Sequence, residues 1–451
     1  MTRPRFTPYA AYKDSGVEWL GEVPVGWKVK RLKRLFRVVN GATPASGEPT
    51  YWDGEIPWVT PDDLGNLTGK SIATSRRNIT VAGYRGCGTT LVPAGSLVLS
   101  TRAPIGHLAL ASTDLCTNQG CRSLVFRSHA CHDFFFYELF AARPELESLG
   151  QGSTFRELAT GMLEDLELAE PPLPEQRAIS TFLDRETARI DTLVAKKERL
   201  ITLLQERRAA LITRAVTKGL DPASPMKDSG VEWLGEIPAN WEAARLRRVL
   251  TWIQQGWSPD CENREADEDE WGVLKAGCVN GGEFVESEHK ALPANESPIP
   301  ALEIQEGDLL MSRASGSRDL VGSVAVVQAC RPRLLLCDKV FRLHVDDVQV
   351  SKPFLAHSLN SRVARSQIES VLSGGSGLAN NIAQGVVKDL VIAIPPREEQ
   401  YRIVSFVDSG VARIDALITR IRAAITHLHE LRTALISAAV TGKIDVREPA
   451  Q

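Results

Sequence analysis

The chain lacks the long apolar runs of a membrane protein. No stretch of its 451 residues approaches the roughly 20 consecutive apolar residues that span a bilayer. The N-terminal segment MTRPRFTPYAAYKDSG has no apolar core of a signal peptide. Hydrophobic content of 43% and charged content of 24% are ordinary for a globular protein. The sequence therefore predicts a folded cytoplasmic protein.

Motifs for metal binding and catalysis are also missing. The eight cysteines include no Cys-x-x-Cys pair, which predicts reduced thiols rather than a metal or redox site. The Asn/Asp-Pro-Pro-aromatic string of amino-methyltransferases is absent, and Glu170-Pro171-Pro172-Leu173 imitates it poorly. Residues 65–71 fall one residue short of a phosphate-binding P-loop, and Leu64 replaces its first glycine. We expect no catalytic residue, no metal and no cofactor bound by this chain.

What the chain does contain is an internal repeat. KDSGVEWLGEVP at residues 13–24 returns as KDSGVEWLGEIP at residues 227–238, with eleven of twelve positions identical. PPLPEQRAISTFLD from Pro171 returns as PPREEQYRIVSFVD from Pro395. The first offset is 214 (227 − 13) and the second is 224 (395 − 171), so the ten extra residues lie between the motifs. Two constant frames therefore enclose two variable bodies, at residues 28–165 and 242–389.

A seven-residue apolar pattern follows both copies of the motif that begins with the proline pair, and it predicts two amphipathic helices. Each helix would have about 40 residues and, at about 1.5 Å per residue, a length close to 60 Å. Such helices bury the apolar side chains of one face most simply by packing against each other, as an intramolecular coiled coil. The predicted spacer coiled-coil residues are Ile190, Leu193, Leu200, Leu204, Leu211, Ile414, Leu417, Ile421, Leu428, Leu431 and Leu435. The proline pairs mark both helix starts, and Gly219 and Gly442 mark both ends.

Chain order adds a geometric expectation. The constant segment precedes the first body at the N-terminus but precedes the second body in mid-chain, directly after the first long helix. Equivalent surroundings for both bodies require the N-terminal segment to lie beside residues 441–446. The termini should therefore be close together, and the helices antiparallel.

Short apolar runs broken by glycine and proline predict an α+β fold for each body, with helices near 134–149 and 353–372. Ser100-Thr101-Arg102 and Ser312-Arg313 each follow a turn and an apolar strand. An arginine at a strand end can reach a phosphate or a guanine, or can close a surface ion pair. The candidate DNA-binding residues are Arg76, Arg77, Arg102, Arg313 and Arg318.

Several strings in the first half of the chain occur in the order found in one known family. They are Gly41-Ala42-Thr43-Pro44, Tyr51–Val59, Ser100–Gly106, Thr117-Asn118-Gln119-Gly120, Gly152-Ser153-Thr154 and Leu173–Arg177. The second half repeats part of the pattern, with Gly375-Ser376-Gly377, Asn380-Asn381 and Glu399-Gln400, but Gln254–Pro259 replaces its opening strings. In this combination the chain resembles the specificity subunits of type I restriction-modification enzymes.

The resemblance implies two target-recognition domains in a pseudo-twofold arrangement, separated by two long helices that form an antiparallel coiled coil. It implies double-stranded DNA, two modification (methyltransferase) subunits and ATP-dependent restriction subunits as partners. S-adenosylmethionine, ATP and Mg would belong to those subunits. Since the two bodies share almost no sequence, an asymmetric two-part DNA target is expected.

The sequence predicts four segments. Residues 1–170 form the first target-recognition domain, with the constant segment 13–27, and residues 171–226 the first spacer helix region. Residues 227–394 form the second domain, with the constant segment 227–241, and residues 395–451 the second spacer region.

The net charge of −3 favours an alternative, a coiled-coil adaptor that pairs two protein partners without DNA. The local excess of basic residues in 171–219, ten against six acidic, favours the DNA reading.

Overall fold

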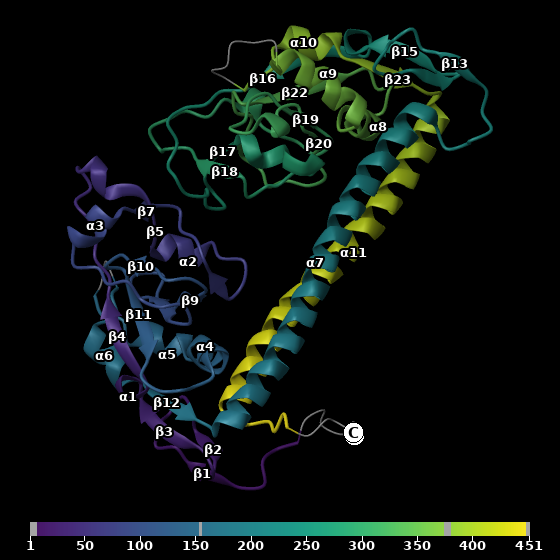
Figure 1. The fold of residues 1–451 in the computed structure, drawn as a ribbon. Coiled ribbons are helices and arrows are strands. Elements are labelled where there is room, and N and C mark those ends of the chain that lie inside the picture. The colour runs from purple at the N-terminus through teal and green to yellow at the C-terminus, as the bar shows by residue number, and fades with distance from the viewer. Residues whose placement is uncertain (1–6, 153–155, 374–379, 448–451) are drawn as a thin grey trace. The chain divides into compact units, whose positions relative to one another are not determined.

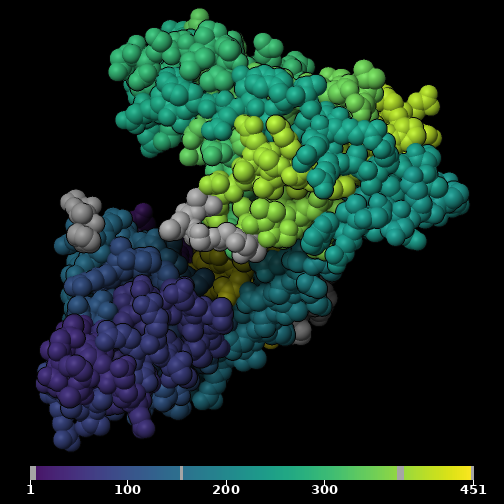
Figure 2. All heavy atoms as spheres, turned by 90° about the horizontal axis from the view of Figure 1, so that it is seen from above, coloured from purple at the N-terminus to yellow at the C-terminus, as the bar shows by residue number. Residues whose placement is uncertain are grey.

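The computed structural model describes residues 7–152, 156–373 and 380–447 and divides into two compact units (Figure 1). The first unit comprises Met1–Lys197 and Ala423–Gln451, and the second comprises Glu198–Arg422. Ser153-Thr154 and Gly375-Ser376-Gly377 lie outside the described residues. Each unit therefore holds one variable body and part of each long helix. Figure 2 draws the heavy atoms of both bodies, the first in purple to blue and the second in teal to green.

The two long helices are α7, Leu173–Lys218, and α11, Arg397–Val440. Each begins directly after a proline pair, where the missing N–H of proline costs no helical hydrogen bond. Each is followed by a glycine in the left-handed region, Gly219 with φ +73° and Gly442 with φ +74°. The two predicted helices and their glycine ends are confirmed. Among the described residues, no helix is both long and apolar enough to cross a membrane.

Within each unit the paired parts of α7 and α11 run antiparallel. In the first unit Asp191 Oδ1 lies 3.2 Å from Arg432 Nε, and in the second Asp415 Oδ1 lies 3.4 Å from Arg208 Nε. The repeat offset relates the two pairs, since 191 + 224 is 415 and 208 + 224 is 432. The antiparallel pairing that the sequence predicts is therefore present in both units, with the same register.

The seam between the helices differs in part from the predicted stripe. Ile190, Leu204, Ile414 and Ile421 are buried as expected, and Leu211, Leu428 and Leu435 are half-buried. Four predicted seam leucines are instead exposed by 43–51%, namely Leu193, Leu200, Leu417 and Leu431. Val194 and Ile418, four residues after Ile190 and Ile414, are buried in place of Leu193 and Leu417. A two-helix seam covers only a narrow stripe of each helix, so leucines at its margin remain in solvent.

The N-terminal segment lies beside the end of α11, as chain order predicts. The backbone N–H of Asp445 donates to the carbonyl of Thr7 at 2.8 Å, and the Tyr12 hydroxyl donates to the carbonyl of Gly442 at 3.1 Å. Each constant segment forms a short hairpin followed by a buried tryptophan, Trp27 or Trp241. Each body therefore starts from the same kind of frame.

In the first body one five-stranded sheet has the order β4-β11-β8-β9-β6, and a smaller sheet has the order β10-β5-β7. The strands of this unit are β1 (Tyr12–Asp14), β2 (Glu22–Pro24), β3 (Lys28–Arg31), β4 (Phe36–Asn40), β5 (Trp52–Val59), β6 (Ser71–Ile72), β7 (Asn78–Ile79), β8 (Leu97–Ser100), β9 (Leu108–Ala111), β10 (Cys116–Thr117), β11 (Cys121–Phe126) and β12 (Glu167–Glu170). Its shorter helices are α1 (Leu32–Leu35), η1 (Pro49–Tyr51), α2 (Pro61–Gly65), α3 (Val81–Arg85), α4 (His132–Ala141), α5 (Arg143–Ser148) and α6 (Thr160–Asp165).

The second domain has the corresponding pair of sheets, β16-β22-β19-β20 and β18-β17-β21. Its strands are β13 (Met226–Asp228), β14 (Glu236–Pro238), β15 (Glu242–Arg245), β16 (Leu250–Gln255), β17 (Gly272–Leu274), β18 (His289–Ala291), β19 (Leu309–Ser312), β20 (Val324–Val326), β21 (Leu334–Leu335), β22 (Val340–Val345) and β23 (Val391–Ile394). Its shorter helices are η2 (Leu246–Arg248), η3 (Ala276–Gly282), η4 (Pro300–Leu302), η5 (Arg318–Leu320), α8 (Lys352–Leu359), α9 (Arg362–Ser373) and α10 (Gln384–Asp389).

Each of the two helices predicted in the bodies is divided in the structure. Residues 134–149 form α4 and α5, separated at Ala142, where Pro144 suits the first turn of a new helix. Residues 353–372 form α8 and α9, and the Ser361 hydroxyl accepts a hydrogen bond from the N–H of Ala364 at the start of α9. The α+β class is confirmed.

Candidate nucleic-acid interface

The loop that opens the first body is fixed by a close backbone approach. Gly41 directly follows β4, and a Cβ at this position would lie 2.0 Å from the carbonyl oxygen of Asn118. The N–H of Ala42 donates to the carbonyl of Thr117 at 3.0 Å, and the indole N–H of Trp58 donates to the carbonyl of Ala42 at 2.9 Å. Only glycine fits such an approach. The strings around Gly41, Trp58 and Thr117 thus form one loop cluster.

Arg102 joins this cluster through the loop after β8. The N–H of Thr101 donates to the carbonyl of Gly120 at 2.8 Å, which holds this loop against the Thr117–Gly120 loop. The Arg102 side chain is exposed and its Nε lies 3.2 Å from Glu157 Oε2. A surface ion pair of this kind is worth little, so the guanidinium can exchange Glu157 for another anion at small cost.

Arg122 is a neighbour of Arg102 that sequence reasoning missed. Its Nη1 donates to the carbonyl of Gln119 at 2.8 Å, and its Nη2 lies 3.8 Å from Glu157. Burial lowers the pKa of Arg122, although the nearby Glu157 opposes this change. Its position two residues after Gly120, the last residue of the Thr117–Gly120 string, was the signal available in the sequence. Two arginines therefore share one carboxylate in this loop cluster.

Arg76 and Arg77 lie on the loop between β6 and β7. The Arg77 guanidinium stacks over the Trp52 ring, 3.7 Å from its centroid, and the N–H of Arg76 donates to Asp63 Oδ1 at 2.9 Å. Both side chains are exposed. The stacking orders the Arg77 guanidinium in an exposed position, as recognition of a phosphate or a base requires.

The second body builds the same loop contact with different residues. A Cβ on Gly256 would lie 2.0 Å from the carbonyl oxygen of Leu336, and the N–H of Trp257 donates to that carbonyl at 3.0 Å. Gly256 therefore has the role of Gly41, although the surrounding strings differ. Ser258 and Asp338 are also hydrogen bonded here.

Arg102 and Arg313, which follow similar strings in the sequence, hold positions one residue apart in the hydrogen-bonding pattern. Arg313 donates its N–H to the carbonyl of Lys339 and accepts from the N–H of Ile382, as Thr101 does with Gly120 and Leu158. Arg102 instead corresponds to Ala314, since each forms an isolated bridge, with Glu157 and Asn381 respectively.

Arg313 and Arg318 share the loop between β19 and β20. Arg313 is half-buried, and its Nη1 donates to the carbonyl of Asp338 at 3.1 Å. Arg318 is exposed, and its carbonyl accepts from Arg365 Nη2 at 3.1 Å. The structure thus places the five candidate arginines on three loops, two in the first body and one in the second. Their contacts with DNA remain predictions.

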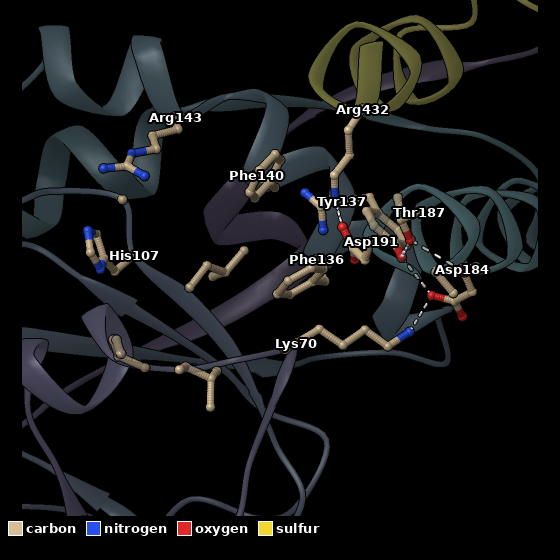
Figure 3. Close-up of a pocket in the computed structure, with 16 residues that line it drawn as sticks. Lys70, His107, Phe136, Tyr137, Phe140, Arg143, Asp184, Thr187, Asp191 and Arg432 are labelled. Carbon is tan, nitrogen blue, oxygen red and sulfur yellow. Dashed lines mark hydrogen bonds and ion pairs between the residues drawn. The ribbon is translucent and has the colours of Figure 1, made fainter. Parts of the chain in front are cut away.

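A cavity of about 470 Å³ lies in the first unit where the recognition domain meets α7 (Figure 3). Lys70 Nζ lies 2.5 Å from Asp184 Oδ1 and 2.6 Å from Asp133 Oδ1, and the Tyr137 hydroxyl donates to Asp184 at 2.7 Å. Burial lowers the pKa of Lys70, but the hydrogen bonds to the two aspartates outweigh it and leave a net rise. This polar cluster ties the domain to the helix.

The second unit has an equivalent tie. Asp408 corresponds to Asp184 by the offset of 224, and its Oδ1 lies 2.8 Å from His357 Nε2 on α8. The two aspartates end the repeated motif that begins with the proline pairs. An aspartate of the constant frame therefore holds a variable body in each unit.

The described residues show no metal-binding cluster. No group of three or more His, Cys, Asp and Glu side chains among them could hold a metal ion. Burial raises the pKa of the Cys116 thiol to about 11 and that of Cys337 to about 12. These thiols are neutral at physiological pH and poor nucleophiles.

Known proteins share this architecture. Residues 24–202 match the family model of the type I restriction modification DNA specificity domain. The MjaIX specificity subunit of Methanocaldococcus jannaschii is 32% identical over 238 residues, covering 51% of this chain and about half, 53%, of that protein. The EcoKI specificity subunit of Escherichia coli K12 is 22% identical over 445 residues, covering 94% of this chain and 90% of that protein.

A solved structure agrees with these matches. A chain from a study of complex assembly and conformational transition of the type I R-M system superposes with a TM-score of 0.70. The identity is 17%, with coverage of 94% of this chain and 99% of that chain. Fold and loop clusters define a protein with two variable domains on paired spacer helices. In sequence the chain is similar to specificity subunits of type I restriction enzymes, and residues 24–202 match the DNA specificity domain of that family.

Proposed function

We propose that this chain is the non-catalytic DNA-recognition subunit of a type I restriction-modification complex. The observation that carries the proposal is the contrast between frame and loops in the two units. The frames share their anchoring residues, since the indole N–H of Trp27 donates to Glu175 and that of Trp241 donates to Glu399, both at 3.0 Å. The loop clusters differ, with Thr101-Arg102 in one and Arg313-Ala314 in the other.

Two dissimilar readers on equivalent frames suit an asymmetric, two-part DNA target. Each reader presents exposed or half-buried arginines on loops, the residue type that contacts phosphates and guanine edges. Arginines that contact phosphate give affinity that falls with salt, whereas those on base edges give specificity. The two half-sites are therefore expected to be read independently of each other. Action on double-stranded DNA would take place in the cytoplasm.

The paired helices supply the proposed docking surface for two modification subunits. Their marginal leucines are exposed by 43–51%, which is more apolar surface than a helix pair needs for itself. Restriction subunits would join this assembly. S-adenosylmethionine, ATP and Mg would be bound by these partners and not by this chain.

The proposal is tested by expressing the chain with its modification subunit and mapping methylated adenines in the host genome. One asymmetric bipartite sequence is expected. Binding of the purified complex to random duplex DNA should fall steeply as salt rises. Absence of both methylation and salt-dependent DNA binding would refute the proposal and favour a protein adaptor.

A further inference from the structure

The loop cluster of the first body presents a hydrogen-bond donor and an acceptor side by side. Arg102 and Glu157 face each other in an isolated antiparallel bridge, which places their side chains on the same side of the backbone, with Cβ atoms about 5 Å apart. Arg102 Nε lies 3.2 Å from Glu157 Oε2, and the two side chains are exposed by 48% and 39%. Within the described part of the chain this is the only hydrogen bond that the Arg102 guanidinium makes. Its Nη1 and Nη2 groups are therefore available to a ligand.

Arg122 holds Glu157 in this place from the other side. The Arg122 side chain is exposed by only 12%, and its Nη2 lies 3.8 Å from Glu157 Oε1. Its Nε donates to the Thr160 hydroxyl at 3.1 Å and its Nη1 to the carbonyl of Gln119 at 2.8 Å, so its position is fixed. A phosphate on Arg102 would have to displace Glu157 or lie beside its negative charge. A base edge with both acceptors and a donor needs neither, so the pair suits a base better than a phosphate.

The donors and acceptors of this pair match a G·C base pair. In the major groove guanine presents two acceptors, N7 and O6, and the paired cytosine presents its N4 amino donor beside them. The Nη groups of Arg102 can donate to both guanine acceptors, and a Glu157 oxygen can accept from the cytosine amino group. An A·T pair fits poorly, because adenine N6 would bring a donor against the guanidinium and thymine O4 an acceptor against the carboxylate.

The second body carries different chemistry at the same position. The backbone hydrogen bonds that flank the bridge correspond in the two bodies, and the bridged residues of the second body are Ala314 and Asn381. Asn381 is exposed and Ala314 is half-buried. An asparagine amide donates to adenine N7 and accepts from adenine N6, and an alanine methyl packs on the methyl group of thymine. This position therefore matches an A·T pair.

We propose that this bridge determines specificity in both bodies, so that Arg102 and Glu157 read a G·C pair in one half-site and Asn381 and Ala314 read an A·T pair in the other. The inference rests on the proposed function and deepens it, since it names a base pair that each body selects. Arg122 is a positioning residue, because it acts through Glu157. The A·T pair is not the methylated one, since a methyltransferase takes its target base out of the helix.

The test uses the full-length chain in complex with its modification subunit, and a target duplex identified by mapping methylated adenines. Fluorescence anisotropy measures binding to this duplex and to duplexes in which one specified base pair is exchanged. Arg102→Ala should abolish discrimination, worth about fivefold or more, at one G·C pair of one half-site. Asn381→Ala should do so at one A·T pair of the other half-site. Arg31→Ala removes an exposed, ion-paired arginine of β3 outside the loop cluster and should leave every discrimination unchanged.

Two further variants extend the test. Arg122→Met releases Glu157 on one side and should reduce discrimination at the same G·C pair as Arg102→Ala, a pattern that general destabilisation does not produce. The double variant Ala314→Arg/Asn381→Glu copies the first body and should change the preferred pair at its position from A·T to G·C. Thermal melting checks the fold of each variant. If the double variant does not fold, the two alanine variants decide, because they only truncate exposed side chains.

An equal loss of affinity on every duplex for Arg102→Ala would assign this arginine to a phosphate and overturn the inference, while leaving the proposed function standing. The same holds if Arg102→Ala relaxes an A·T pair, if Asn381→Ala relaxes a G·C pair, or if either variant keeps every discrimination. A folded double variant that still prefers A·T would also overturn the inference. Failure of the wild-type complex to discriminate between any of the duplexes would overturn both the inference and the proposed function.

Discussion

Two glutamines of the repeated frame should be among the most costly polar residues to remove. Gln176 Oε1 accepts from the N–H of Cys131 at 3.0 Å, and its Nε2 donates to the carbonyl of Pro171 at 2.8 Å. Gln400 Oε1 accepts from the N–H of Ser351 at 2.8 Å. Each glutamine thus joins the start of a long helix to the residue that caps α4 or α8.

Gln400 has one more partner than Gln176. Its Nε2 donates to the carbonyls of Gln349 and Pro395, both at 3.0 Å. Its side chain is fully buried, whereas Gln176 is exposed by 4%. Methionine has a similar length and helix propensity but cannot replace these hydrogen bonds. Substitution therefore strands two backbone groups at position 176 and three at position 400, and one of the first two and two of the last three lie in buried hydrogen bonds.

The expected loss of unfolding free energy follows from these counts. At about 1–2 kcal/mol for each stranded backbone group, Gln176→Met costs about 2–4 kcal/mol and Gln400→Met about 3–6 kcal/mol. Chemical denaturation of each variant measures the loss. Arg177→Met changes an exposed neighbour and serves as the control, with an expected effect within about 0.5 kcal/mol. A loss below about 1 kcal/mol for Gln400→Met, or a larger loss at position 176, would refute the reasoning.

Three further predictions concern the interface, the helix seam and a buried acid. Arg102→Ala should weaken binding to the cognate duplex by about 1–3 kcal/mol and leave binding to random duplex unchanged, as measured by fluorescence anisotropy. An equal loss on both duplexes would instead assign Arg102 to a phosphate. Asp191→Arg should lower stability by about 1 kcal/mol, and adding Arg432→Asp should restore it in a double-mutant cycle, because this ion pair is partly exposed. Full additivity of the two changes would count against the pair. Burial raises the pKa of the Glu138 carboxyl well above its usual value near 4.5, so the folded protein favours its protonated form. The stability from that form is complete below pH about 4.5 and is lost as pH rises toward the folded pKa. Glu138→Gln should therefore stabilise the protein at pH 8 relative to pH 4, as urea denaturation at both values will show. An equal effect at both values would contradict the raised pKa.

Several parts of the site were within reach of the sequence and others were not. The repeated motifs located both frames, both long helices and the contact between the N-terminal segment and the end of α11, because chain order and helix periodicity constrain them. The sequence did not indicate Arg122, nor that Thr101 and Arg313 hold equivalent positions in the two bodies. Backbone hydrogen bonds between distant loops leave no periodic signal in the sequence. The sequence predicted Leu193 and Leu417 in the helix seam, but Val194 and Ile418 are buried there instead. Residues three and four positions after an isoleucine lie on neighbouring parts of one helix face, so the pattern does not distinguish them.

The sequence by itself determined that the chain is built twice, with a constant frame around two dissimilar bodies, because a repeat of eleven identities in twelve positions needs no folding to be seen. Tertiary structure alone decided how the copies differ. At equivalent positions of the repeat, Glu186 is buried in the first unit, whereas Gly410 lines a groove beside α7 and α11 in the second unit. Packing against a partner helix determines whether a side chain fills space or leaves it empty, and that partner lies about 200 residues away in the chain.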